Sequence, residues 1–167
     1  MKLKPKHFIT GLALVTALAI AEVISTQTGL TAPNPSQENG PSLEGTWRVQ
    51  VTIRDCNSGA SLRTFPAFLT FAQGGTLTET TTGFPPSLRS PGHGFWQHTT
   101  DHSYLAVSEA FLFNPAGVWT GTQRLTQSIE IGDGPDELNS TATNEIYNTT
   151  GQLITSGCST AVATRME

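Results

Sequence analysis

The chain has 167 residues and a formal net charge of −4, and charged residues make up only 13% of it. All three lysines lie within the first six residues, and the chain after residue 21 has six arginines against thirteen acidic residues, a formal charge of −7. This balance argues against binding to nucleic acid or to anionic lipid. The 26 threonines favour a β protein over a helical bundle, a coiled coil or a charged disordered tail.

The first residues have the layout of an export signal. Three lysines are followed by an uncharged run from Phe8 to Ala21, which ends in the small-residue pattern Ala19-Ile20-Ala21. The run gives roughly 21 Å of helix, too short for a bilayer core of about 30 Å, so we expect a cleaved signal peptide at 1–21, with a retained anchor as the alternative. Residues 22–42 are polar and rich in proline, and they predict a disordered tether ahead of a domain spanning 43–167.

Cys56 and Cys158 are the two cysteines of the sequence, 102 positions apart. Because thiols oxidise outside the cytoplasm, we expect one disulfide in a periplasmic or secreted protein, with two buried free thiols as the alternative. Their spacing favours neither a metal site nor a redox motif.

From Leu43 onward, apolar residues alternate with polar ones, and glycine, proline, asparagine and aspartate interrupt the pattern every 8 to 15 residues. The clearest segment is 46–54, in which Trp47, Val49, Val51 and Ile53 share one face. The same reasoning predicts eight strands in all: 46–54, 62–72, 76–82, 94–99, 102–113, 118–131, 137–147 and 152–165.

The links between these segments are mostly short, as in hairpins. Two of them share one design, an aromatic residue and Asn, then two intervening residues and Gly (Phe113-Asn114…Gly117 and Tyr147-Asn148…Gly151), which predicts a type I turn with glycine at positive φ. The segment 84–91, with three prolines, is the one long irregular link, and it is either a lid over an opening or a simple crossover.

Eight strands joined by hairpins would leave two exposed edges, and closure into a barrel removes both. We therefore predict an all-β, up-and-down, antiparallel barrel whose first and last strands pair. If Cys56 lies opposite Cys158 in that pairing, Val49 lies opposite Arg165, and Arg165 is diagonal to Trp47, within reach for a guanidinium to stack on the indole.

Gly45-Thr46-Trp47 at the start of the first strand, the eight-strand meander and Arg165 near the end of the last strand resemble the calycin superfamily, the lipocalins and their bacterial relatives. The motifs T-F-x-x-G-G-T (70–76) and G-H-G-x-W (92–96) are also similar to a set of exported bacterial proteins, a likeness that brings no activity with it. The calycin resemblance implies that Trp47 lies at the closed end of the barrel, with Arg165 packed over it, and that both are structural residues.

A barrel of eight strands either is filled by its side chains or holds one small ligand. Alternation places large apolar residues inside, and Glu79 and Glu109 fall in phase with them, either as ligand contacts or at a solvated barrel mouth. The ligand-binding side chains that we predict on this basis are Phe71, Glu79, Glu109, Phe111, Trp119 and Gln123.

His93, His98 and His102 do not have the spacing of a metal site, and no nucleophile motif occurs, so we expect neither a metal nor a cofactor. Three functional classes remain. The favoured one is a binding protein with a small apolar or amphipathic molecule in the barrel. The others are a plugged structural or interaction module and a cyclase- or isomerase-type barrel enzyme that uses an interior Glu.

Overall fold

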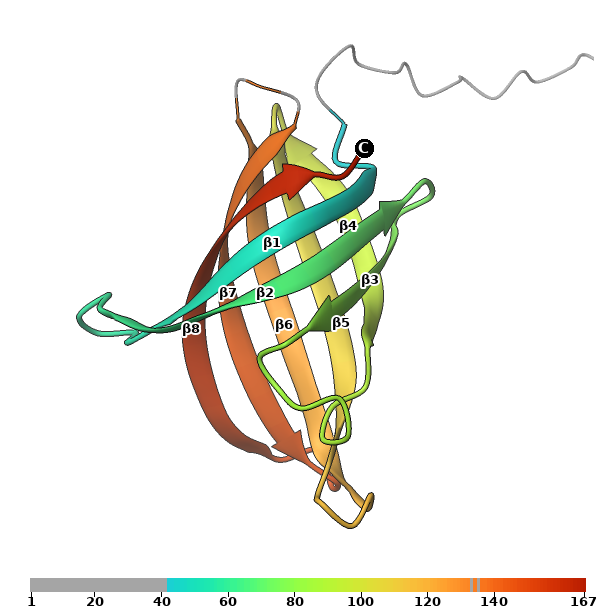
Figure 1. Ribbon diagram of the computed structural model, residues 1–167, viewed down its shortest axis with the longest axis vertical. Helices are drawn as coiled ribbons and strands as arrows, with labels where there is room; N and C mark the ends of the chain where they lie inside the picture. Colours follow the sequence, from blue (N-terminus) through green and yellow to red (C-terminus); the bar gives the residue numbers. More distant parts are fainter. Residues whose placement is uncertain (1–41, 133, 135) are drawn as a thin grey trace, which may run out of the picture. The chain divides into compact units, whose positions relative to one another are not determined.

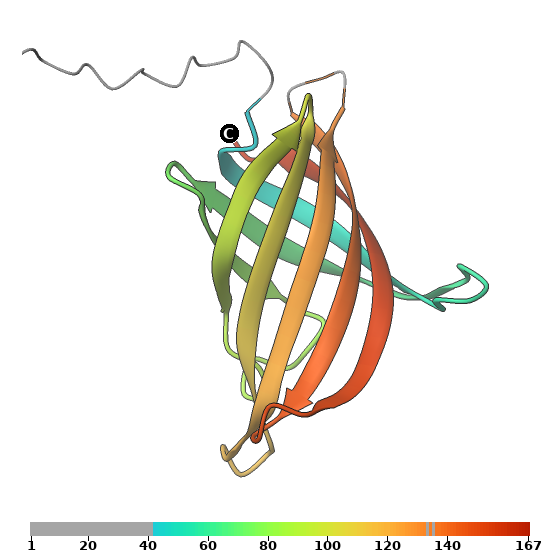
Figure 2. The ribbon, with the colours of Figure 1, turned by 180° about the vertical axis from the view of Figure 1, so that it is seen from behind.

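A computed structural model describes residues 42–132, 134 and 136–167. Eight antiparallel strands follow one another around a closed barrel, and the last strand is hydrogen-bonded to the first (Figure 1, Figure 2). The strands are β1 (Gly45–Arg54), β2 (Ser61–Ala72), β3 (Thr76–Thr81), β4 (Gly92–Thr100), β5 (Ser103–Phe113), β6 (Trp119–Ile131), β7 (Glu137–Asn148) and β8 (Leu153–Arg165). The predicted fold class is confirmed, and every predicted strand boundary lies within two residues of the observed one.

The predicted signal peptide, and the predicted tether as far as residue 41, lie outside the described residues. Within the described part of the chain, no helix is long and apolar enough to cross a membrane.

The two turns of shared design form as expected. In the β5–β6 turn the Asn114 side chain accepts hydrogen bonds from the backbone of Ala116 and Val118, and Gly117 has a φ of +76°. In the β7–β8 turn Asn148 does the same, and Gly151 has a φ of +80°. Because only glycine adopts this backbone conformation at little cost, these asparagine–glycine pairs fix the ends of two hairpins.

The barrel closes between β1 and β8 in a register two residues away from the predicted one. Trp47 lies directly opposite Arg165, and Val49 lies opposite Ala163. The prediction assumed that Cys56 belongs to the first strand, but β1 ends at Arg54, and Cys56 lies in the turn that follows. The shift is an even number of residues, so each side chain of β1 keeps its predicted face.

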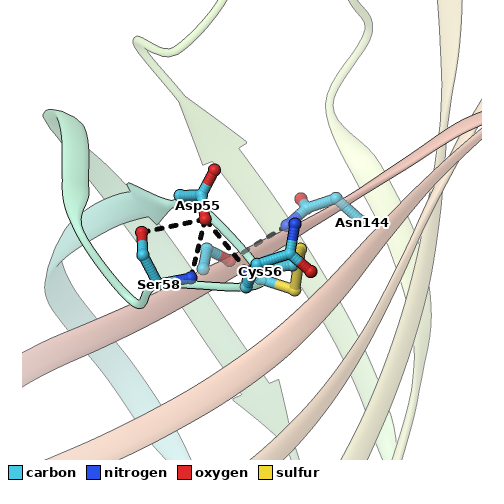
Figure 3. The surroundings of a disulfide bond; sticks show 7 residues. Asp55, Cys56, Ser58 and Asn144 are labelled. Atoms are coloured by element: carbon cyan, nitrogen blue, oxygen red, sulfur yellow. Dashed lines mark hydrogen bonds between the residues drawn. A yellow bond between two sulfur atoms is a disulfide. The ribbon is translucent and has the colours of Figure 1, made fainter.

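Cys56 and Cys158 form the predicted disulfide, with Cα atoms 5.3 Å apart (Figure 3). The bridge ties the β1–β2 connection to β8 and so reinforces the strand pair that closes the barrel. Beside it, one Asp55 carboxylate oxygen accepts hydrogen bonds from the backbone of Asn57 and Ser58 and from the Ser58 hydroxyl. These bonds lower the pKa of Asp55, with the Ser58 backbone as the largest contributor.

One half of the barrel interior is packed solid. Its core contains nine large apolar or aromatic side chains: Leu43, Trp47, Leu69, Phe71, Leu77, Tyr104, Ile129, Ile131 and Leu138. Burial raises the pKa of Tyr104 in this core. These residues come from the start of β1, the β2–β3 hairpin, the start of β5 and the β6–β7 hairpin, which lie at the same end of the barrel as the C-terminus (Figure 1). This is the closed end.

Arg165 seals the closed end, as the calycin resemblance implied. Its guanidinium lies 4.3 Å from the centre of the Trp47 ring and donates hydrogen bonds to the backbone oxygens of Ser42 and Glu44. Gly45 has a φ of +123°, and a Cβ atom there would lie 2.7 Å from the Arg165 guanidinium. Glycine at this position therefore allows both the backbone conformation and the approach of the arginine.

Candidate functional site

The other half of the barrel contains an open cavity of about 470 Å³. Apolar side chains of β1 and β2, among them Val51, Phe65 and Leu69, form one wall, and more polar side chains of β6, β7 and β8 form the opposite wall. The irregular segment between β3 and β4 completes the lining with Phe84, Pro85 and Arg89. This volume lies within the usual range for small-molecule sites, about 300–1,000 Å³.

The cavity exists because the inward residues of β7 and β8 are small. Ser140 lies opposite Ala161, Ala142 lies opposite Ser159, and Gly157 pairs with Asn144. A Cβ atom added at Gly157 would have no atom within 4 Å. Two adjacent strands therefore leave open the space that larger side chains fill at the closed end.

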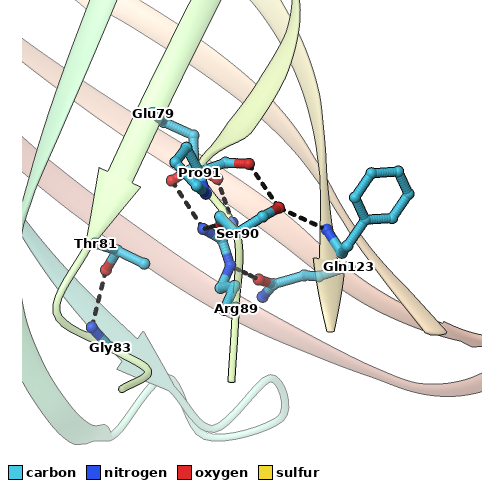
Figure 4. A network of polar contacts seen from close by, with 8 residues as sticks. Glu79, Thr81, Gly83, Arg89, Ser90, Pro91 and Gln123 are labelled. Atoms are coloured by element: carbon cyan, nitrogen blue, oxygen red, sulfur yellow. Dashed lines mark hydrogen bonds and ion pairs between the residues drawn. The ribbon is translucent and has the colours of Figure 1, made fainter. Parts of the chain in front are cut away.

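A buried ion pair lies on the cavity wall (Figure 4). Arg89, from the β3–β4 segment, donates to both carboxylate oxygens of Glu79 on β3, and its Nε donates to the side-chain oxygen of Gln123 on β6 at 2.6 Å. Arg89 and Glu79 are only 5% and 4% exposed. A buried charge is tolerated when it is paired and hydrogen-bonded, and here each charge neutralises the other.

The strand geometry leaves room for this carboxylate at one specific point. Gly92 lies opposite Glu79 in the β3–β4 pairing, and a Cβ atom at Gly92 would lie 2.1 Å from the Glu79 carboxylate. Any larger residue at position 92 would displace Glu79 from Arg89.

The β3–β4 segment is held along its length. The Arg63 side chain of β2 donates to the Gly83 backbone oxygen at 2.7 Å and lies over the Phe65 ring. Further along, the Ser90 backbone donates to the Phe111 oxygen, and the Phe113 backbone donates to the Leu88 oxygen. The segment thus pairs with the end of β5, beyond the reach of β4, and forms part of the barrel wall. It is more than a simple crossover, because four of its residues, Gly83 included, line the cavity.

One side chain of the cavity wall lacks a hydrogen-bond partner. The side-chain nitrogen of Gln127 on β6 is buried and donates to no described atom, and the residue is only 6% exposed. Its inward neighbours in the sheet are Ala106 on β5 and Ala142 on β7, whose side chains offer no acceptor. By contrast, Asn144 donates to the Ser159 hydroxyl at 3.0 Å.

The structure brings two of the six predicted ligand-binding residues to the cavity, Glu79 and Gln123. Phe71 faces inward as expected, but it belongs to the core of the closed end, where its ring packs against Trp96. Glu109, Phe111 and Trp119 lie on the outer surface, so their predicted inward placement is wrong. Glu109 forms an exposed ion pair with Arg124, and Phe111 and Trp119 pack edge to face while about half exposed.

The error on β5 has a physical cause. Both faces of this strand are apolar, and the prediction placed the face that carries Glu109 and Phe111 inside. The residues that face inward are Tyr104, Ala106, Ser108, Ala110 and Leu112. Trp119 was also expected to face inward from β6. Its partner on β5 is Phe113, and the β5–β6 pairing shifts register between Leu112 and Phe113. Because of this shift, the Trp119 side chain turns outward.

The most important residue that the sequence reading missed is Arg89. It is the one arginine in the long proline-rich segment, and an in-phase Glu79 needed a partner, so the two together carried a usable signal. The unpartnered nitrogen of Gln127 becomes visible only in the finished packing.

Among the described residues, no group of three or more His, Cys, Asp or Glu side chains lies close enough together to hold a metal ion. A scan against protein-family models finds no match for the chain, and neither does a search of curated proteins.

Proposed function

We propose that this protein is an exported, calycin-like binding protein that holds a small hydrophobic or amphipathic molecule in its barrel. The observation that carries the proposal is the cavity of about 470 Å³, with an apolar wall on one side and a few polar groups on the other. Small-molecule sites generally have this composition. The disulfide between Cys56 and Cys158 is compatible with export.

The cavity favours this proposal over a plugged structural module, because side chains fill only the closed half of the interior. Binding is also favoured over catalysis. Glu79 already accepts hydrogen bonds from Arg89 with both of its oxygens, so it is poorly placed to act as a general base.

A fluorescence titration tests the proposal directly. N-phenylnaphthylamine, a neutral and environment-sensitive probe, should bind saturably to the purified protein at a stoichiometry of one. Replacing Gly157 by Phe should abolish the saturable signal, because the new ring would occupy the open space inside β8. The matched control is Val162→Phe on the same strand, since Val162 is 58% exposed and faces outward.

Both variants should unfold cooperatively within a few degrees of the parent protein. Absence of saturable binding to the parent would overturn the proposal, and so would equal binding by the parent and by a folded Gly157→Phe variant. In that case the barrel is better explained as a structural or interaction module.

A further inference from the structure

We infer that the cavity selects uncharged molecules that carry a hydrogen-bond acceptor, such as a ketone, ester or amide, and rejects carboxylates. The inference rests on the proposed function and specifies its ligand class. Two observations carry it: the Glu79–Arg89 pair that neutralises the buried charge of the wall, and the buried side-chain nitrogen of Gln127 that has no partner.

The first observation concerns charge. Among the residues that the structure describes, Glu79 is the one acidic residue of the cavity lining, and Arg89 is the one buried cation. A guanidinium has five N–H donors. Arg89 uses four of them on Glu79, Gln123 and the Ser90 backbone oxygen. A ligand carboxylate would therefore lose its hydration, meet the negative charge of Glu79 and find little donor capacity left on Arg89.

The other cation of the lining is Arg63, which is exposed and already donates to the Gly83 backbone oxygen. Solvent screens its charge, and it lies at the strand end rather than deep in the barrel. It therefore offers a carboxylate little attraction inside the cavity.

The second observation concerns hydrogen bonding. A buried donor without a partner is costly, and the alanines that flank Gln127 on both neighbouring strands cannot supply an acceptor. A ligand oxygen at this part of the wall would satisfy the amide. An alkane would leave it unpaired, so the same residue distinguishes an acceptor-bearing molecule from a purely apolar one.

The test is a competition assay in which a second molecule displaces N-phenylnaphthylamine from the parent protein at neutral pH. The four competitors have equal medium chain length: an alkane, a methyl ketone, a methyl ester and a fatty acid. We expect the ketone and the ester to bind about three- to tenfold more tightly than the alkane, the usual effect of one hydrogen bond. The fatty acid should bind at least about tenfold more weakly than the ketone.

Two variants assign these preferences to residues. Gln127→Met, which is apolar and similar in volume, should bring the ketone down to the affinity of the alkane. Glu79→Gln leaves Arg89 without its counter-charge, so the fatty acid should gain at least about tenfold in affinity while the ketone is unaffected. Glu109→Gln is the matched control, because it breaks an exposed ion pair on the outer surface and should change neither preference.

If Glu79→Gln does not fold, the double variant Glu79→Gln with Arg89→Gln replaces the ion pair by two neutral amides and should reject the fatty acid as the parent does. The parent competition alone is also decisive. A fatty acid that displaces the probe as well as the ketone does would overturn the inference, and so would equal binding of alkane and ketone. Either result leaves the proposed function intact, whereas failure of the probe itself to bind overturns that function.

Discussion

Replacing Arg165 by Ala should destabilise the barrel without changing what it binds. The guanidinium stacks 4.3 Å from the centre of the fully buried Trp47 ring and donates to the backbone oxygens of Glu44 and Ser42. Its ion pair with Asp136 is a smaller contribution, because the Asp136 side chain is 70% exposed. The substitution removes all of these contacts at once.

The loss in unfolding free energy can be estimated from the individual contacts. The stack contributes about 1 kcal/mol, the part-buried hydrogen bond to Glu44 about 1.5 kcal/mol and the exposed bond to Ser42 about 0.5 kcal/mol. The sum is about 3 kcal/mol. For a domain of this size the melting temperature falls by about 4 °C per kcal/mol, so we expect a decrease of roughly 12 °C.

Urea unfolding followed by tryptophan fluorescence measures this loss. A double-mutant cycle with Trp47→Leu, which removes the aromatic ring, isolates the stack and should give a coupling energy of about 1 kcal/mol. The unfolding free energy of Arg165→Lys should lie between those of the parent and of Arg165→Ala. Lysine keeps the positive charge, but it lacks the planar guanidinium that donates to two backbone oxygens at once. Probe affinity should stay at the parent value throughout, because the cavity lies in the opposite half of the barrel.

Two results would refute this reasoning. A loss below about 1 kcal/mol for Arg165→Ala would mean that solvent replaces the arginine contacts at little cost. A folded Arg165→Ala variant with weakened probe binding would mean that the two halves of the barrel are not independent.

Three further predictions follow from local geometry. Reducing the disulfide, or replacing Cys56 and Cys158 by Ser, should lower the unfolding free energy by about 2–5 kcal/mol, measured by urea titration with and without reductant, and peptide mapping without reduction should recover the Cys56–Cys158 link. Hydrogen bonds lower the pKa of Asp55 in the fold, so its ionised carboxylate stabilises the turn at pH values above the ordinary pKa of 3.8, and this stabilisation is lost as the pH falls below 3.8. Hydrogen exchange of the Ser58 amide should therefore accelerate below that pH. Asp55→Asn should remove this pH dependence. In the same urea assay, Gly94→Ala should lower the unfolding free energy by more than about 2 kcal/mol, since its Cβ would lie 1.8 Å from the Val107 backbone oxygen. Gly157→Ala has open space around the new atom, so it should leave the unfolding free energy unchanged or raise it slightly.

The strand pattern could be predicted from the sequence because most strands have one clearly apolar face. In β1, Trp47 and Val49 are buried while Arg48 and Gln50 are exposed, so burial on a single side leaves an alternation that is easy to read. The pattern fails on β5, whose outer face carries Val107 and Phe111 and whose inner face carries alanines and a serine. Alternation alone cannot rank two apolar faces.

The site was harder to predict than the fold because it depends on pairings between distant segments. Arg89 reaches Glu79 and Gln123 only because the irregular β3–β4 segment runs beside the end of β5 before β4 begins. Nothing local to residue 89 indicates this path. Gln127 likewise has no partner only because the register places an alanine on each side of it.

The same register explains why this barrel is hollow at one end. The inward positions of β7 and β8 hold Leu138 and Ala163 near the closed end and then Ser140, Ala142, Gly157 and Ser159 along the cavity. Each buried methylene that is missing from these positions forgoes about 0.8 kcal/mol of possible stabilisation. A barrel with only a structural role would gain stability from larger side chains here. The small residues are therefore better explained by a need for space inside the barrel, and that need connects the sequence of β7 and β8 to the proposed binding of a small molecule.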